Sequence, residues 1–284
     1  MKNGLIWVIV LVLLAMGAWY FSMRQDQSAL EDIQMLPAPP DSEIAAPEPR
    51  YPVEDVVTPE PETNTSLEEP EAFVEPPAPL PTLAESDGEV FVQAQGLVPE
   101  ADLASLLVPD FVLSRLVATI DGLDAARLPQ PMRPLKPVPG RFEVLEMNGE
   151  VVISPANGAR YRPFLDLVEA VDVDAAVAQY VRYYPLLQEA YLGLGYERSY
   201  FNDRVIEVLD LLLATPEPLG MIELRQNEAV YEFLDPDLEA LAVGQKAMLR
   251  MSAEDRQALR DKLAQFRAAL AGVETGPDQN VEGN

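Results

Sequence analysis

Tyrosine and arginine side chains gather in one stretch of about forty residues. Seven of the ten tyrosines lie between positions 161 and 200, and five arginines lie among them or within four residues of them. A flat tyrosine face edged by guanidinium and carboxylate groups suits a groove for a glycan or a peptide, because it offers apolar surface and directional polar groups together. The candidate binding residues are Arg160, Tyr161, Tyr183, Tyr184, Tyr196, Asn202, Asp203 and Arg204.

The same residues also have a purely structural interpretation. Tyr180, Tyr184 and Tyr191 recur at helical spacing, which is typical of a packed helix face. Residues 202–204 fall in the first turn after Ser199, where acidic and amide side chains are favoured by the helix dipole and by free N–H groups. The sequence leaves packing and binding open for the tyrosines, and capping, ion pairing and function open for residues 202–204.

The chain lacks two residue types on which many catalytic and metal sites depend. It contains no histidine and no cysteine, which excludes zinc sites built on these residues, Cys nucleophiles and Ser-His-Asp triads. Asp172 and Asp174 lack the surrounding loop of a calcium site, so a helix-capping role is expected for one of them. Gly193 and Gly195 are expected to end a helix. We expect no metal and no cofactor, while a carboxylate pair acting on glycan stays open.

The charge of the chain restricts its partners. The formal net charge is −27, and residues 25–89 hold seventeen acidic residues but one basic residue, Arg50. Nucleic acid would be repelled, so it is not expected as a partner.

The N-terminal region predicts a membrane anchor. Residues 4–23 contain no charge and would span about 30 Å as a helix, which matches a hydrocarbon core. A cleaved signal peptide, with a site near Ala15-Met16-Gly17, is the alternative. Lys2 on one side favours a cytoplasmic N-terminus, residues 1–3. The expected location is the bacterial inner membrane, with the lipid bilayer as a partner and the C-terminal domain in the periplasm.

Residues 24–83 are predicted to be a disordered acidic tether. Thirteen of the 27 prolines lie between positions 37 and 81, and their spacing favours polyproline II over helix. The tether serves either as a spacer or as a docking motif for a partner. Residues 272–284 are predicted to form a second disordered segment.

Residues 84–271 predict one compact domain, mainly α with a small β component (α+β). Asn148-Gly149 between two β-prone runs predicts a hairpin at about 141–153 with a type I′ turn. Pro109 is expected as the first residue of a helix. The other expected elements are a helix from near Asp174 with a kink or break at Pro185, a helix over 199–214, short strands at 221–224 and 229–233, and a last helix after a cap at Ser252.

Several unusual strings resemble a known family. They include Tyr183-Tyr184-Pro185-Leu186-Leu187, Tyr200-Phe201-Asn202-Asp203-Arg204 and Leu212-Leu213-Ala214-Thr215-Pro216. In this order they are similar to the proteobacterial membrane-anchored proteins catalogued as domain of unknown function 3014, over roughly residues 81–270. The resemblance implies a location in the cell envelope, but it supplies no activity and no catalytic residue.

The sequence therefore favours a membrane-tethered, non-catalytic binding or scaffolding module with an envelope protein or cell-wall partner. The alternative is a carboxylate-dependent hydrolase or lyase acting on envelope glycan. A purely structural spacer or assembly factor is a third hypothesis.

Overall fold

A computed structural model describes residues 48–53, 79–98, 102–128, 133–138, 140–196, 198–227 and 230–271. The predicted anchor at 4–23, most of the tether at 24–83 and the tail at 272–284 lie outside these residues. Among the described residues, no helix is long and apolar enough to cross a membrane. The fold is mainly helical with one small antiparallel sheet, as the sequence predicts.

Six helices of ten or more residues build most of the body. They are α2 (Asp87–Leu97), α4 (Val112–Asp121), α5 (Asn157–Ala170), α6 (Val173–Leu192), α7 (Phe201–Leu213) and α10 (Ala253–Ala271). Apolar side chains three and four residues apart give each of α7 and α10 a buried face, and Phe201 and Phe266 are fully buried there. The large helical core lies between these faces.

Shorter elements complete the body. They are η1 (Leu83–Glu85), α3 (Leu103–Leu106), η2 (Gly122–Asp124), α8 (Pro236–Glu239) and α9 (Val243–Leu249). Gly244 of α9 lies close to Leu123 and Leu212, so that a Cβ there would come within 2.7 Å of the Leu212 side chain. The absence of a side chain lets α9 approach α7 and η2.

The sheet is a meander of two hairpins. The strands β1 (Val144–Met147), β2 (Glu150–Ile153), β3 (Glu223–Asn227) and β4 (Val230–Phe233) lie in the order β1-β2-β3-β4, and all neighbours are antiparallel. Leu224 and Phe233 form a small second core with Leu249 of α9. This core attaches the sheet to the helices.

The turn between β1 and β2 has the predicted geometry. Asn148 has φ of 54° and Gly149 has φ of 89°, so both central residues are in the left-handed region that a type I′ turn requires. The predicted hairpin at about 141–153 is confirmed, with β1 and β2 paired from Val144–Ile153 to Met147–Glu150.

Two helices differ from the sequence predictions. Of the kink or break expected at Pro185, the break does not occur: α6 is one helix from Val173 to Leu192, because buried side chains on both sides of the proline keep its face on the core. Pro109 does not begin α4, which starts at Val112 after Phe111 in a left-handed conformation. The Asp87 carboxylate of α2 accepts the N–H groups of Phe111 (2.7 Å) and Val112 (2.8 Å), so a distant residue caps this helix.

Other local signals are confirmed. Asp172 caps α6 by accepting the N–H of Ala175 at 2.8 Å, and α6 ends at Leu192 with Gly193 as its C-cap. Ser252 accepts the N–H of Asp255 at 3.0 Å at the start of α10. The predicted strand at 221–224 exists but is shifted toward Asn227.

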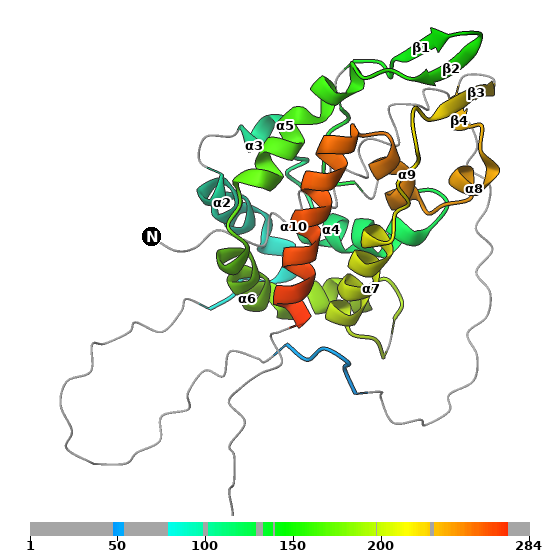
Figure 1. The fold of residues 1–284 in the computed structure, drawn as a ribbon. Coiled ribbons are helices and arrows are strands. Elements are labelled where there is room, and N and C mark those ends of the chain that lie inside the picture. Colours follow the sequence, from blue (N-terminus) through cyan, green and yellow to red (C-terminus); the bar gives the residue numbers. More distant parts are fainter. Residues whose placement is uncertain are drawn as a thin grey trace, which may run out of the picture.

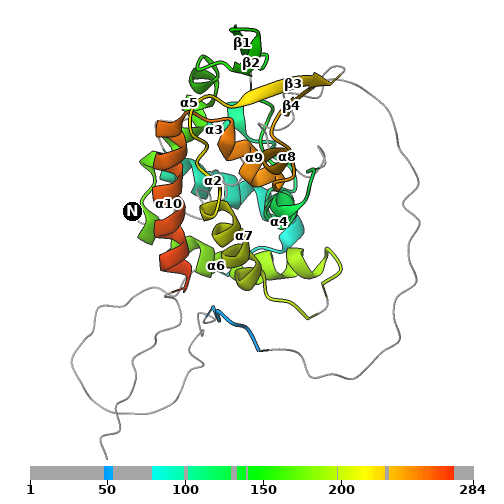
Figure 2. The same ribbon diagram turned by 45° about the vertical axis from the view of Figure 1, so that its right-hand side comes forward.

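The sheet and residues 48–53 lie at opposite ends of the helical body (Figure 1). The view turned by 45° shows the same arrangement, with α10 running along the body from the sheet end to the end where residues 48–53 lie (Figure 2).

Candidate functional site

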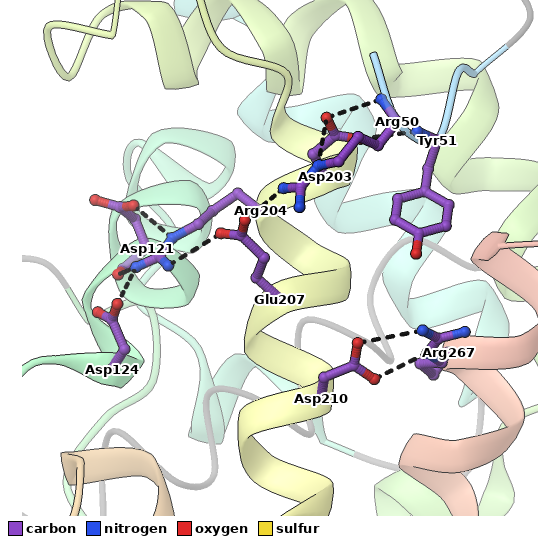
Figure 3. A network of polar contacts seen from close by, with 9 residues as sticks. All are labelled: Arg50, Tyr51, Asp121, Asp124, Asp203, Arg204, Glu207, Asp210 and Arg267. Atoms are coloured by element: carbon purple, nitrogen blue, oxygen red, sulfur yellow. Dashed lines mark hydrogen bonds and ion pairs between the residues drawn. The ribbon is translucent and has the colours of Figure 1, made fainter.

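The start of α7 holds an extended segment from far away in the chain. Asp203 accepts two main-chain hydrogen bonds from this segment, from the N–H of Arg50 to Oδ2 (3.0 Å) and from the N–H of Tyr51 to Oδ1 (2.9 Å). Asn202 donates its side-chain amide to the Tyr51 carbonyl at 2.9 Å. Both side chains are buried, and Figure 3 shows the Asp203 carboxylate facing the backbone of the segment.

We call this arrangement the peptide seat: Asn202, Asp203 and Glu207 of α7 with residues 48–53 on them. The Arg50 guanidinium lies 3.6 Å from Asp203 through Nε, and its Nη2 donates to Glu207. Tyr51 and Val53 pack against the helical core. The seat therefore contacts the backbone of the segment, the charge of its arginine and the apolar surface of its tyrosine.

Arg204 extends from α7 toward the loop after α4. Its Nε lies 2.9 Å from Asp121, its Nη2 lies 2.8 Å from Asp124, and its Nη1 lies 3.6 Å from Glu207 (Figure 3). Burial lowers the pKa of Arg204, but the hydrogen bonds and charges of the two aspartates outweigh burial and raise it above the ordinary value. Glu207 thus joins the peptide seat to a rigid ion-pair network.

Two tyrosines cover this network from the end of α6. The Tyr196 hydroxyl donates to Asp121 Oδ2 at 3.0 Å, and its ring stacks on Tyr191 with centroids 4.7 Å apart. Burial raises the pKa of Tyr191 to about 12, with a smaller contribution from the charge of Asp121. A cavity of about 300 Å³ lies beside the seat, with Tyr191, Arg198 and Tyr200 in its lining.

Gln188 of α6 fixes where α7 begins. Its Oε1 accepts the N–H of Phe201 at 2.8 Å and its Nε2 donates to the Ser199 carbonyl at 2.8 Å. The Tyr184 hydroxyl donates to the same Oε1 at 3.1 Å. Tyr184 therefore supports the seat through Gln188.

Five of the eight candidate residues meet at this end of the molecule: Tyr184, Tyr196, Asn202, Asp203 and Arg204. The other three lie elsewhere. Arg160 donates to Asn157 (3.1 Å) and to the Gly140 carbonyl (3.1 Å), with its guanidinium 5.5 Å from the centroid of the buried Tyr161 ring. These two residues secure the base of the β1–β2 hairpin.

Tyr183 is fully buried and faces α2. Its hydroxyl donates to Glu89 at 2.6 Å, and Glu89 also pairs with Arg182 at 3.2 Å. Burial, followed by the hydrogen bond to Glu89, raises the pKa of Tyr183 to about 12. Tyr183 thus has a packing role that links α6 to α2.

Sequence reasoning missed the other half of the seat. Arg50 and Tyr51 are not among the candidates because they lie in the tether, for which the sequence indicates a spacer or a docking motif for a partner. Glu207 of α7 is not among them either, since a single exposed acidic residue on a helix carries no signal of its own. One signal could have found Arg50 and Tyr51. Arg50 is the single basic residue among seventeen acidic ones between positions 25 and 89, and an aromatic residue follows it directly.

The carboxylates of the site are held by donors. Asp203 accepts two N–H groups, Asp121 accepts from Arg204 and Tyr196, and Glu207 faces Arg50 and Arg204. A general acid and base need carboxyl groups that are available to a substrate. Within the described ranges, no group of three or more acidic side chains is arranged to hold a metal ion. The arrangement is suited to binding.

Comparison with known proteins gives a family and no activity. A family model described as "Protein of unknown function (DUF3014)" matches residues 112–267, which is more than half of the chain, and the chain therefore belongs to this family. No curated protein and no solved structure matches it.

Proposed function

We propose that this DUF3014 protein is a non-catalytic binding module, tethered to the bacterial inner membrane, that holds an extended segment of an envelope protein on the peptide seat. Residues 48–53 of the chain occupy the seat when the partner segment is absent. The observation that carries the proposal is the set of three hydrogen bonds from Asn202 and Asp203 to the main chain of Arg50 and Tyr51.

Because the seat contacts main-chain groups, it can bind extended segments other than residues 48–53. Every residue except proline offers the same N–H and C=O groups, so a site that recognises them accepts other extended segments of suitable shape. Hydrogen bonds from N–H groups to a carboxylate such as that of Asp203 are of the stronger, charge-assisted kind. The seat can therefore exchange one segment for another without a change in its own geometry.

The side chains of the resident segment indicate what a partner segment must carry. Arg50 meets Glu207 and Asp203, and Tyr51 packs on the core beside Arg267 of α10 (Figure 3). A partner that displaces residues 48–53 should present a basic residue followed by an aromatic or large apolar residue. Such a segment replaces both the ion pairs and the apolar contact.

The membrane tether rests on the sequence. Residues 4–23 are uncharged and long enough to span a bilayer, and residues 48–53 follow within the next thirty residues. Lys2 and the acidic run after Arg24 favour a periplasmic location for the folded domain. The segment bound on the seat would then belong to the stretch of chain that connects the membrane anchor to the folded domain.

A peptide-binding experiment tests the seat. The full chain lacking residues 48–53 should bind a labelled peptide copying residues 46–55 with one-to-one stoichiometry in fluorescence anisotropy, whereas the unmodified chain should not. Asp203→Asn in the shortened chain removes one charged acceptor and should weaken binding about tenfold or more. Asp166→Asn, an equal change on the exposed face of α5, should leave it unchanged.

Equal affinity of the shortened chain with and without Asp203→Asn would show that the peptide binds elsewhere. Release of soluble fragments from purified cell-wall glycan by the unmodified chain, abolished by Asp203→Asn, would replace the proposal with the glycan hydrolase or lyase alternative.

A reporter experiment tests the tether separately. A reporter fused after Asn284 and active only in the periplasm should be active, and the protein should stay in the membrane fraction after a high-salt wash. A cytoplasmic reporter signal, or a product that begins near Ala18 and washes off, would contradict the tether and leave the seat untouched.

A further inference from the structure

A second cavity lies at the opposite end of the molecule from the peptide seat. Its volume is about 350 Å³, and it is a half-open cavity lined by the end of β2 and the chain after it (153–158), the chain before β3 (218–222) and the junction of α9 and α10 (249–256). This volume is within the range of small-molecule sites. It is formed without any residue of the seat.

Two buried arginines line this cavity. Arg250 is 3% exposed and Arg256 is 8% exposed, and no acidic residue is among the residues that line it. Such a lining is unusual in a chain with a formal net charge of −27. A fixed local excess of positive charge therefore faces the cavity.

Arg256 carries its charge without a close counter-ion. In the described part of the chain, its guanidinium forms no hydrogen bond and no ion pair, and Glu217 acts on it only through longer-range attraction. Burial lowers the pKa of Arg256, and the neighbouring charge of Arg260 acts in the same direction. A buried cation in this state costs free energy that a bound anion would recover.

The start of α10 adds to the positive electrostatic potential at the cavity. Ser252 and Ala253, at the N-terminal end of this nineteen-residue helix, line the cavity, where the helix dipole favours negative charge. The nearby carboxylate of Asp255 is engaged by Arg162 at 3.3 Å. The rest of the wall is largely apolar, with Pro155, Met221 and Leu249 among its residues.

We propose that this cavity binds a small amphiphilic anion, with a carboxylate or phosphate group on Arg256 and an apolar body against the remaining wall. Arg256 supplies the ion pair and the wall supplies the apolar contact. The lining therefore indicates both the anionic group and the apolar body of the ligand. The proposal does not depend on the peptide seat.

Fluorine NMR on the full chain tests the proposal with three matched probes. They are 4-fluorobenzoate, 4-fluorophenyl phosphate and the uncharged 4-fluorobenzamide. We expect saturable binding of at least one anionic probe, at least about tenfold tighter than that of the amide. The carboxylate and the phosphate share the proposed chemistry, and their relative affinity shows which headgroup fits.

Arg256→Met keeps the length of the side chain and removes its charge, and should weaken binding of the anion about tenfold or more. Arg267→Met makes the same change at the far end of α10 and should leave the affinity unchanged. Because Arg256 has no close partner to lose, Arg256→Met should also keep or raise the unfolding midpoint. Arg256→Lys should retain part of the affinity.

Three results would overturn the proposal. They are equal affinity for the amide and the anions, undiminished binding to the folded Arg256→Met protein, and no binding of either anion at millimolar concentration.

Discussion

Two arginines illustrate opposite uses of the same side chain. Arg204 is surrounded by Asp121, Asp124 and Glu207, whereas Arg256 lines a cavity and forms no ion pair with the acidic residues that the structure describes. The first has its charge balanced within the fold, so its loss leaves carboxylates behind. The loss of the second leaves no described carboxylate unpaired. Substitutions of Arg204 and Arg256 should therefore change the free energy of unfolding in opposite directions or by different amounts.

Replacing Arg204 with Met should lower the free energy of unfolding by about 2–4 kcal/mol, because the partly buried Asp121 loses its cation. Chemical denaturation measures this loss. Adding Asp121→Asn should recover part of it, since the second change removes the uncompensated charge.

The control for this prediction is Arg225→Met, which removes an exposed ion pair to Glu232 across the β3–β4 hairpin. We expect a loss of about 1 kcal/mol or less there. A similar loss at both positions would mean that the Arg204 network does not stabilise the fold.

At the scale of single elements, the β1–β2 turn and α2 give a matched pair of glycines. Gly149 has φ of 89° in the turn, while Gly88 lies in the first turn of α2 with open space around its Cα. Gly149→Ala should destabilise by about 1 kcal/mol or more, and Gly88→Ala should stabilise by up to about 1 kcal/mol. Thermal and denaturant unfolding of both variants measure the two changes in stability. A change in the same direction at both positions would contradict the assigned turn.

Elements that depend on neighbours in the sequence were predictable. The Asn148-Gly149 turn, the Asp172 cap, the Ser252 cap and the apolar faces of α7 and α10 all follow from spacings of a few residues. The predictions that failed needed distant information. Pro185 stays within a helix because tertiary burial outweighs one missing hydrogen bond, and Asp87 caps α4 from 24 residues away.

Prediction of the candidate site from the sequence has the same limit, because contacts between distant residues leave no local pattern. The sequence singled out Asn202, Asp203 and Arg204 because unlike polar groups stand together at a helix start. It could not supply Arg50, which lies 153 residues from Asp203, because pairing over that distance leaves no periodic signal. The arginines of the second cavity were missed for the same reason, since the residues that line it come from three separate stretches of chain.

At the scale of the whole molecule, one protease cut reports whether the seat is occupied. Arg50 is the only basic residue between positions 25 and 89, so trypsin can cut this stretch only after Arg50. The Tyr51 N–H on the other side of that bond is held by Asp203, and cleavage requires the segment to leave the seat.

Asp203→Asn should therefore speed cleavage after Arg50 about tenfold or more, because one of the two hydrogen bonds to the segment is lost and the other is no longer charge-assisted. Mass spectrometry of the digest measures the rate, and Asp166→Asn on α5 should leave it unchanged. If trypsin cuts the unmodified chain and the Asp203→Asn variant equally fast, the segment is not protected by the seat.

If residues 4–23 anchor the chain in a bilayer as proposed, occupation of the seat also sets how far the domain can lie from that bilayer. With residues 48–53 fastened to α7, the connection from the proposed anchor consists of residues 24–47, which can span at most about 80 Å. Once a competing segment takes the seat, the connection runs to residue 78 and its limit rises to about 190 Å. Capture of a partner would then more than double the distance that the domain can reach from the proposed anchor, so that the exchange of hydrogen bonds at one aspartate would become a change in reach.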